Sequence, residues 1–195
     1  EAAMPSIVSI TTKSVEEVQN YYGMFGQYGA YSPSQEQEVQ GSGSGIIIGK
    51  NDSELLIATN YHVVEGAETL SVGFCDSTAC EAKVQCYNGE PDLTVVAVSL
   101  DDIDSDTMDA ITIATIGNSD DLKVGAQVVA IGNALGYGQS VTTGIVSAKN
   151  RTTDASGQIE SGDSTDNSSS INKGVNLIQT DAAINPGNSG GALLN

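Results

Sequence analysis

The residue with the clearest potential for chemistry is Ser189, which lies between glycines in the stretch Gly187-Asn188-Ser189-Gly190-Gly191. One interpretation is a glycine-rich turn that enters the apolar run 192–194. The other is a nucleophile on a tight loop. Gly187 has no Cβ, so the backbone there can point the N–H groups of Gly187 and Ser189 at a substrate oxyanion. Because Gly-Xaa-Ser-Gly is a common sequence, other residues must decide between the two.

A serine hydroxyl needs a general base, usually histidine, and His62 is the only histidine of the chain. It follows the apolar stretch 54–59, where a polar turn begins; a lone histidine at a strand end can also be purely structural. Asp92 stands at the start of the apolar stretch 93–98, where a partly desolvated carboxylate requires a partner. A carboxylate is the group that orients such a base. The order His62, Asp92, Ser189 along the chain is that of chymotrypsin-type triads.

Four stretches of the sequence together resemble the protease domain of the HtrA (Deg) family of trypsin-like serine proteases. They are GSGSGIIIG at 41–49, TNYHVVEGA at 59–67, LKVGAQVVAIGNALGYGQSVTTG at 122–144 and IQTDAAINPGNSGGALLN at 178–195. The last is highly specific. The resemblance implies a chymotrypsin/trypsin-like double β-barrel.

The resemblance also implies a role for individual residues. His62 would be the base, Asp92 the acid that orients it, and Ser189 the nucleophile. The oxyanion hole would consist of Gly187 and Ser189 with Asn188 between them, and Ile184 would line the substrate pocket. No metal or organic cofactor is needed for this chemistry.

The function implied by the resemblance is that of a serine endopeptidase, which hydrolyses peptide bonds of unfolded or damaged proteins through an acyl-enzyme in protein quality control. The complete protein would be a homotrimer. It would be extracytoplasmic, in a bacterial periplasm or held at the cell surface through a segment outside this chain. Two other classes stay open: a catalytically idle protein-binding or chaperone module on the same fold, and a purely structural β domain.

Composition agrees with an all-β protein, because 22 glycines and many short apolar runs rich in Val, Ile and Thr alternate with turn residues. The formal net charge of −18 argues against nucleic acid or an anionic membrane as a partner. No stretch is long and apolar enough to span a membrane. The charge itself is best explained by a solvated acidic surface.

The elements that must position the chemistry form two halves. Residues 1–100 are predicted to form an N-terminal barrel of six strands, at 6–12, 44–49, 54–59, 69–75, 81–87 and 94–100, with a long aromatic loop at 13–40. This loop either joins subunits, as the resemblance implies, or packs on its own domain. Residues 101–118 are a linker with a solvated acidic start at 101–109, whose spacing does not fit a calcium loop.

Residues 119–195 are predicted to form the C-terminal barrel. A capped helical turn at 119–125 precedes strands at 126–132, 139–147 and 175–180, and 150–174 is predicted to be a flexible loop because it has scarcely an apolar residue. Family members continue for two more strands after the serine motif. We therefore expect the second barrel to lack its last two strands in this chain.

The three cysteines, Cys75, Cys80 and Cys86, lie in one short region. Cys75 and Cys80 flank a hairpin turn at 76–79, so a disulfide between them is plausible in an oxidising compartment and would leave Cys86 unpaired. A zinc site of these cysteines with His62 is disfavoured because no close Cys-x-x-Cys pair is present. A cysteine nucleophile is disfavoured because no oxyanion turn adjoins them.

Overall fold

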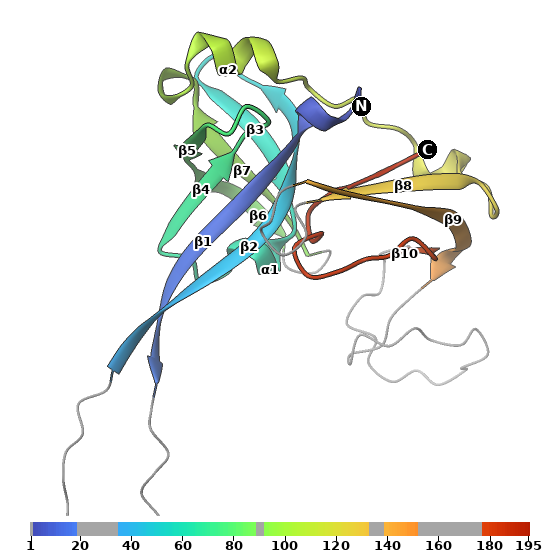
Figure 1. Ribbon diagram of the computed structural model, residues 1–195, viewed down its shortest axis with the longest axis horizontal. Coiled ribbons are helices and arrows are strands. Elements are labelled where there is room, and N and C mark those ends of the chain that lie inside the picture. The colour runs from blue at the N-terminus through green and yellow to red at the C-terminus, as the bar shows by residue number, and fades with distance from the viewer. Residues whose placement is uncertain (1, 19–34, 89–91, 133–138, 152–176) are drawn as a thin grey trace, which may run out of the picture.

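The computed structural model describes residues 2–18, 35–88, 92–132, 139–151 and 177–195. Its strands form two curled sheets that lie side by side (Figure 1). The seven-stranded sheet has the order β5-β4-β1-β2-β3-β7-β6 and the four-stranded sheet the order β10-β9-β8-β11. The predicted all-β fold class is confirmed by these two sheets.

The first sheet contains β1 (Ile7–Val18), β2 (Gln35–Lys50), β3 (Glu54–Thr59), β4 (Thr69–Gly73), β5 (Ala79–Glu81), β6 (Lys83–Asn88) and β7 (Leu93–Ser99). All of its neighbouring strands are antiparallel. The predicted strand at 81–87 is interrupted, because Ala82 is buried and donates its N–H to Leu70 O at 2.9 Å. The chain thus leaves one edge of the sheet as β5 and joins the other edge as β6. This step curls the sheet toward a barrel.

Alternating burial along the strands builds the core of this sheet. In β3 every second residue is buried, which is the period-2 pattern of a strand with one face inward. Residues with no exposed surface fill the interior: Ile10, Ile47, Ile57, Val72, Val96 and Val98. Burial of each such side chain stabilises the fold by about 1.5–3 kcal/mol before entropic costs. This packed core holds the strands in place, and with them the residues at the strand ends.

The predicted loop at 13–40 is wrong at both ends. β1 and β2 pair continuously from Lys13 opposite Gln40 to Val18 opposite Gln35, and the ribbon extends beyond the rest of the sheet (Figure 1). Backbone pairing holds this ribbon, and its largely polar sequence gives no apolar alternation by which to recognise it. The aromatic residues of the predicted loop lie outside the described residues.

The segment between the sheets begins with two helices, η2 (Leu100–Asp102) and α2 (Ser105–Ala110). The prediction of a solvated stretch at 101–109 is wrong at Ile103 and Thr107, which are 7% and 1% exposed. The Asp104 side chain caps α2 by accepting from Thr107 N at 2.8 Å. The Thr107 hydroxyl in turn donates to Asp76, so this acidic segment is docked on the first barrel.

Asp76 lies in the turn between β4 and β5, and its carboxylate accepts hydrogen bonds from the Thr107 side chain and from the Thr78 side chain and backbone. The hydrogen bond from Thr107, followed by those from Thr78, lowers the pKa of Asp76 below its usual value of 3.8.

The predicted hairpin around 76–79 is present, but the cysteines do not face each other across it. β4 ends at Gly73, so Cys75 lies in the turn, and the cross-strand partner of Cys80 is Val72. Cys75 Sγ contacts Ala110 O at 3.7 Å and Cys80 Sγ contacts Asp102 O at 3.2 Å. All three cysteines are free thiols. Burial and the acidic side chains nearby raise the pKa of Cys80.

The second sheet contains β8 (Gln127–Gly132), β9 (Ser140–Arg151), β10 (Leu177–Thr180) and β11 (Ala192–Leu194). It is preceded by η3 (Ser119–Asp121), whose cap is Asn118. Ile7 at the start of β1 packs with Ile131 and Ala192, and this contact joins the two sheets. The short helix η1 (Met4–Ser6) precedes β1. Of the predicted flexible loop 150–174, residues 150 and 151 belong to β9 and the rest lies outside the described residues.

The expectation that the second barrel lacks its last two strands stays a prediction, as do the domain boundaries at 100 and 118. Beside β11 lies a hollow of about 500 Å³, lined by residues that include Ile46, Val128 and Leu194. None of the helices in the described parts of the chain is long and apolar enough to cross a membrane.

Candidate active site

His62 and Asp92 meet because the strands that carry them are neighbours. α1 (Tyr61–Val64) follows β3 after one residue, Asn60, and Asp92 directly precedes β7. Since Thr59 at the end of β3 pairs with Thr94 of β7, residues 30 positions apart in sequence come together. Asp92 Oδ2 lies 2.6 Å from His62 Nδ1, and Asp92 Oδ1 accepts from the His62 backbone N–H at 2.9 Å.

The carboxylate fixes the form of the imidazole. An ionised carboxylate only accepts hydrogen bonds, so the proton of this contact belongs to His62 Nδ1. Nε2 of the neutral ring then carries a lone pair and can accept a proton. The two side chains are 54% and 42% exposed, so the pair lies at an accessible surface and not in the core. This arrangement suits a general base with an acid that orients it.

The backbone of Asp92 is itself held in an uncommon conformation. Its φ of 51° lies in the left-handed region, which aspartate tolerates better than most residues. Its carbonyl accepts from Tyr61 N at 3.2 Å and from the Asn60 side chain at 2.9 Å. Non-glycine residues in such conformations gather at functional sites, where surrounding bonds hold them.

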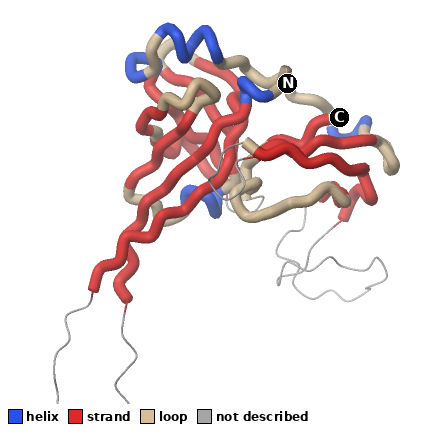
Figure 2. Tube along the Cα trace, in the orientation of Figure 1, coloured by secondary structure: helices blue, strands red, loops and turns tan. Residues whose placement is uncertain are grey.

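Ser189 lies in the serine turn (residues 185–191), part of the irregular segment between β10 and β11 that Figure 2 shows in tan. Within the turn, Asn188 N donates to Asn185 O at 3.0 Å and Gly191 N to Asn188 O at 2.9 Å. Gly190 has a φ of 79°, and a Cβ on it would overlap Ser44 O and Thr59 Oγ1. Glycine is therefore required there both by conformation and by close packing.

Hydrogen bonds tie the serine turn to the first sheet. Ser44 of β2 donates its N–H to Ser189 O at 2.8 Å and its hydroxyl to Gly187 O at 2.7 Å. Gly190 N donates to Asn60 Oδ1 at 2.6 Å. Ser44 is completely buried, so its two bonds to the serine turn are shielded from water.

Ser189 thus comes to lie against the segment that bears His62. A Cβ placed on Gly43 would be 2.6 Å from Val63 Cγ1 and 3.3 Å from Ser189 O, so only a glycine separates the residue after His62 from the serine backbone. Within the described residues no hydrogen bond joins Ser189 Oγ to the His62 ring. Nucleophile and base are often farther apart without substrate than during reaction.

The other predicted residues lie in or beside the serine turn. Gly187 is buried and has a φ of 95°. Its N–H and that of Ser189 donate to no described residue, whereas the Asn188 side chain accepts from Ser140 Oγ at 3.3 Å and so faces the second sheet. Ile184 is 60% exposed, one residue before the turn.

Sequence inspection missed two residues, Ser44 and Asn60. Both are within the stretches that carry the family resemblance, but their partners are 143 and 130 positions away. A single sequence gives no signal for such contacts. Asn60 could have been noted as a preferred residue for a helix start.

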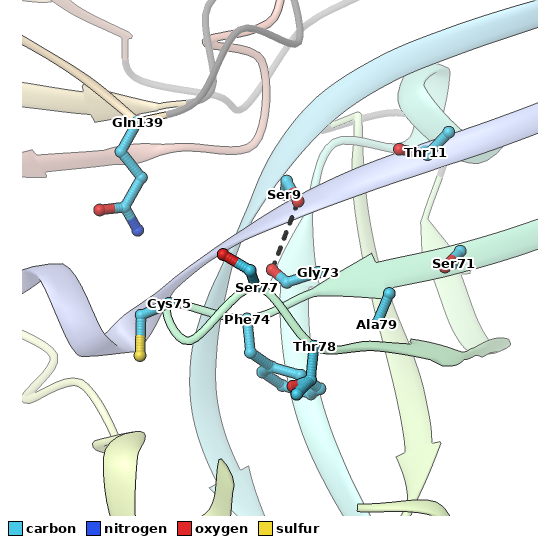
Figure 3. A pocket seen from close by; sticks show the side chains of 10 residues that line it. All are labelled: Ser9, Thr11, Ser71, Gly73, Phe74, Cys75, Ser77, Thr78, Ala79 and Gln139. Atoms are coloured by element: carbon cyan, nitrogen blue, oxygen red, sulfur yellow. Dashed lines mark hydrogen bonds between the residues drawn. The ribbon is translucent and has the colours of Figure 1, made fainter.

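A separate hollow of about 490 Å³ lies on β1, β4 and the turn that follows β4 (Figure 3). Half of its lining residues carry hydroxyl groups, among them Ser9, Ser71 and Thr78, and Gln139 lies across from them. None of the predicted catalytic or pocket residues lines it. The candidate active site is therefore the junction of α1, the residue before β7 and the serine turn.

Comparisons with known proteins identify the family of the chain. Residues 43–195 match the family model of the trypsin-like peptidase domain. The chain is 39% identical over 197 residues to the serine protease Do-like HtrA of Bacillus subtilis, covering 100% of this chain and 39% of that protein. It is 39% identical over 159 residues to a probable periplasmic serine endoprotease DegP-like of Hahella chejuensis, covering 82% of this chain and 28% of that protein.

Among solved structures, the HtrA-type protease AlgW with decapeptide superimposes with a TM-score of 0.68 at 31% identity, covering 99% of this chain and 53% of that chain. The chain thus spans 39% of the length of the Bacillus subtilis relative and about half of AlgW. The family match covers most of the chain, including the segments that hold His62, Asp92 and Ser189. The chain therefore belongs to the trypsin-like peptidase family, as a serine endopeptidase domain of the HtrA type.

Proposed function

We propose that the complete protein hydrolyses peptide bonds with Ser189 as nucleophile, His62 as general base and Asp92 as the acid that orients the base. The observation that carries this proposal is the paired contact of Asp92 with the His62 ring and backbone, beside a serine turn bonded to the same segment. A serine that adjoins an oriented imidazole is the arrangement that acyl transfer requires.

The proposed reaction has two steps. Ser189 Oγ attacks the scissile carbonyl carbon while His62 Nε2 takes the hydroxyl proton, and the imidazolium then gives that proton to the leaving amine as the peptide bond breaks. Water attacks the resulting ester with His62 again as base, which releases the carboxylic acid and restores the serine. Asp92 keeps Nδ1 protonated and stabilises the charged ring throughout.

The oxyanion of each tetrahedral intermediate needs donors that are already in place. The N–H groups of Gly187 and Ser189 suit this role, because neither donates to another described residue. The buried Ser44 hydroxyl holds the Gly187 carbonyl, which fixes the peptide between Gly187 and Asn188. Asn188 links these two donors through its backbone, while its own N–H bonds Asn185 O and its side chain bonds Ser140.

The substrates we propose are unfolded or damaged proteins, cut after small aliphatic residues, with the exposed side chain of Ile184 in the substrate pocket. The HtrA-type protease AlgW was solved with a decapeptide, which supports a peptide ligand for the complete protein. We further propose a homotrimer with a role in protein quality control. An extracytoplasmic location is supported by the relative described as a probable periplasmic DegP-like endoprotease.

A serine-to-alanine pair of variants tests the proposal. Ser189→Ala in the complete protein should reduce casein degradation by about 10⁴-fold or more, as expected for a triad nucleophile. Ser53→Ala, in the exposed turn before β3, removes the same hydroxyl far from the site and should leave the rate unchanged. Unchanged casein degradation by Ser189→Ala would refute the proposed function.

A further inference from the structure

The side chain of Asn60 bonds two parts of the site at once. Its Nδ2 donates to Asp92 O at 2.9 Å, and its Oδ1 accepts from Gly190 N at 2.6 Å. The orientation of the amide is unambiguous, because a backbone carbonyl can only accept and a backbone N–H can only donate. Asn60 thus contacts the backbone of the proposed acid on one side and the residue after the proposed nucleophile on the other.

The amide is available for these bonds because another residue caps α1. Asn60 is the N-cap of α1, a position where an asparagine side chain normally accepts from the second or third N–H of the helix. It makes no such bond. Asp92 satisfies the helix start instead, with its carbonyl on Tyr61 N and its carboxylate on His62 N. The Asn60 amide is therefore left to join Asp92 to Gly190.

Catalysis by the proposed triad depends on placing groups from two sheets. The base and the acid lie at strand ends of the first sheet, whereas the nucleophile lies in the segment between β10 and β11 of the second. Within the described residues, the side chains outside the second sheet that bond the serine turn are those of Ser44 in β2 and of Asn60, which follows β3. Of these two, only Asn60 also bonds Asp92, so it links the backbone of the acid directly to the serine turn.

Resting on the proposed function, we infer that Asn60 is a positioning residue that holds Ser189 within reach of the His62 ring by linking Gly190 to Asp92. It touches no reacting atom. Loss of the link lets the serine turn shift relative to the base, and a misplacement of about 1 Å costs about 10²-fold in rate. Because the reacting groups align only in the transition state, the loss should appear in kcat and not in KM.

Three variants of the complete protein test the inference against cleavage of a short peptide. Asn60→Ala removes both bonds and should lower kcat about 10²-fold with little change in KM. Asn60→Asp keeps an acceptor for Gly190 N but loses the donor to Asp92 O, so its kcat should lie between those of wild type and Asn60→Ala. Asn51→Ala is the matched control, because Asn51 also bonds backbone N–H groups, of Ser53 and Glu54, in a turn away from the site.

The control should lower the melting temperature and leave kcat unchanged. A kcat of Asn60→Ala equal to that of wild type, or reduced only by the unfolded fraction seen by circular dichroism, overturns the inference. If Asn60→Ala does not fold, Asn60→Asp decides, and full activity of that variant counts against the link to Asp92. Ser189→Ala is assayed alongside: if it abolishes cleavage while the Asn60 variants are fully active, the proposed function stands and only the role of Asn60 fails.

Discussion

Replacement of Gly190 by alanine tests how closely the serine turn is seated on the first sheet. Gly190 has a φ of 79°, and its added Cβ would overlap Ser44 O and Thr59 Oγ1. The left-handed conformation costs alanine about 1–2 kcal/mol. Relief of the overlap costs about 1–3 kcal/mol more, because the atoms that must move are a backbone carbonyl and a buried hydroxyl.

The total of about 2–5 kcal/mol should lower the melting temperature by about 10 °C, given about 2–4 °C per kcal/mol for a domain of this size. Two other glycines separate the contributions. Gly66 has a φ of 68° and open space around it, so Gly66→Ala should cost only the conformational part. Gly49 has open space and no positive φ, so Gly49→Ala should stay within about 0.5 kcal/mol of wild type.

The assay is thermal unfolding of the four proteins by circular dichroism, followed by peptide cleavage at a temperature where all are folded. At a temperature where all four proteins are folded, Gly190→Ala should still cleave the peptide more slowly than wild type, because its Cβ displaces the turn that bears Ser189. If Gly190→Ala is no less stable than Gly66→Ala, the overlap is absent. The serine turn then does not lie against β2 and β3 as described.

Three further predictions address the acid, the turn after β4 and the thiols. Asp92→Asn should lower kcat about 10⁴-fold, since an amide can stabilise the wrong tautomer of the base; a loss below tenfold in steady-state cleavage would contradict its role. The lowered pKa of Asp76 stabilises the fold above pH 3.8, and this stabilisation is lost as the pH falls from there through the lowered pKa. The melting temperature of Asp76→Asn should therefore lie below that of wild type at pH 7 and approach it under acid. A constant difference in melting temperature from pH 7 to pH 3 would contradict this. The raised pKa of Cys80 leaves less thiolate, so iodoacetamide should modify Cys80 more slowly than Cys75 at pH 7.5. Peptide mass spectrometry follows the two modification rates. Equal rates would argue against the packing of Cys80 beside Asp102.

The sequence allowed the chemistry to be predicted where residue type and local context coincide. His62 and Asp92 are recognisable because His62 follows the apolar run 54–59 and Asp92 directly precedes the apolar run 93–98. Their meeting follows from the pairing of β3 with β7, which places Thr59 opposite Thr94. Their catalytic roles, like that of Ser189, stay predictions until activity is measured.

Other features depend on partners that are remote in sequence. The two bonds of the Asn60 amide cannot be read locally, because Gly190 is 130 positions away. The burial of Thr107 within an acidic stretch depends on Asp76, 31 positions earlier. The break between β5 and β6 at Ala82 is not visible in the sequence, because the residues on both sides of it are typical of strands. The two strands differ only in their pairing partners, β4 for β5 and β7 for β6.

The most direct test of the account is covalent labelling by an active-site-directed fluorophosphonate. An activated serine displaces fluoride from phosphorus and passes its proton to the base, so labelling reports the nucleophile and its activation together. We predict one adduct per chain, on Ser189, in the folded protein and none after unfolding in urea or in His62→Ala. Absence of an adduct on Ser189 in the folded protein, or equal labelling of the His62→Ala variant, would contradict the proposal that these side chains act together.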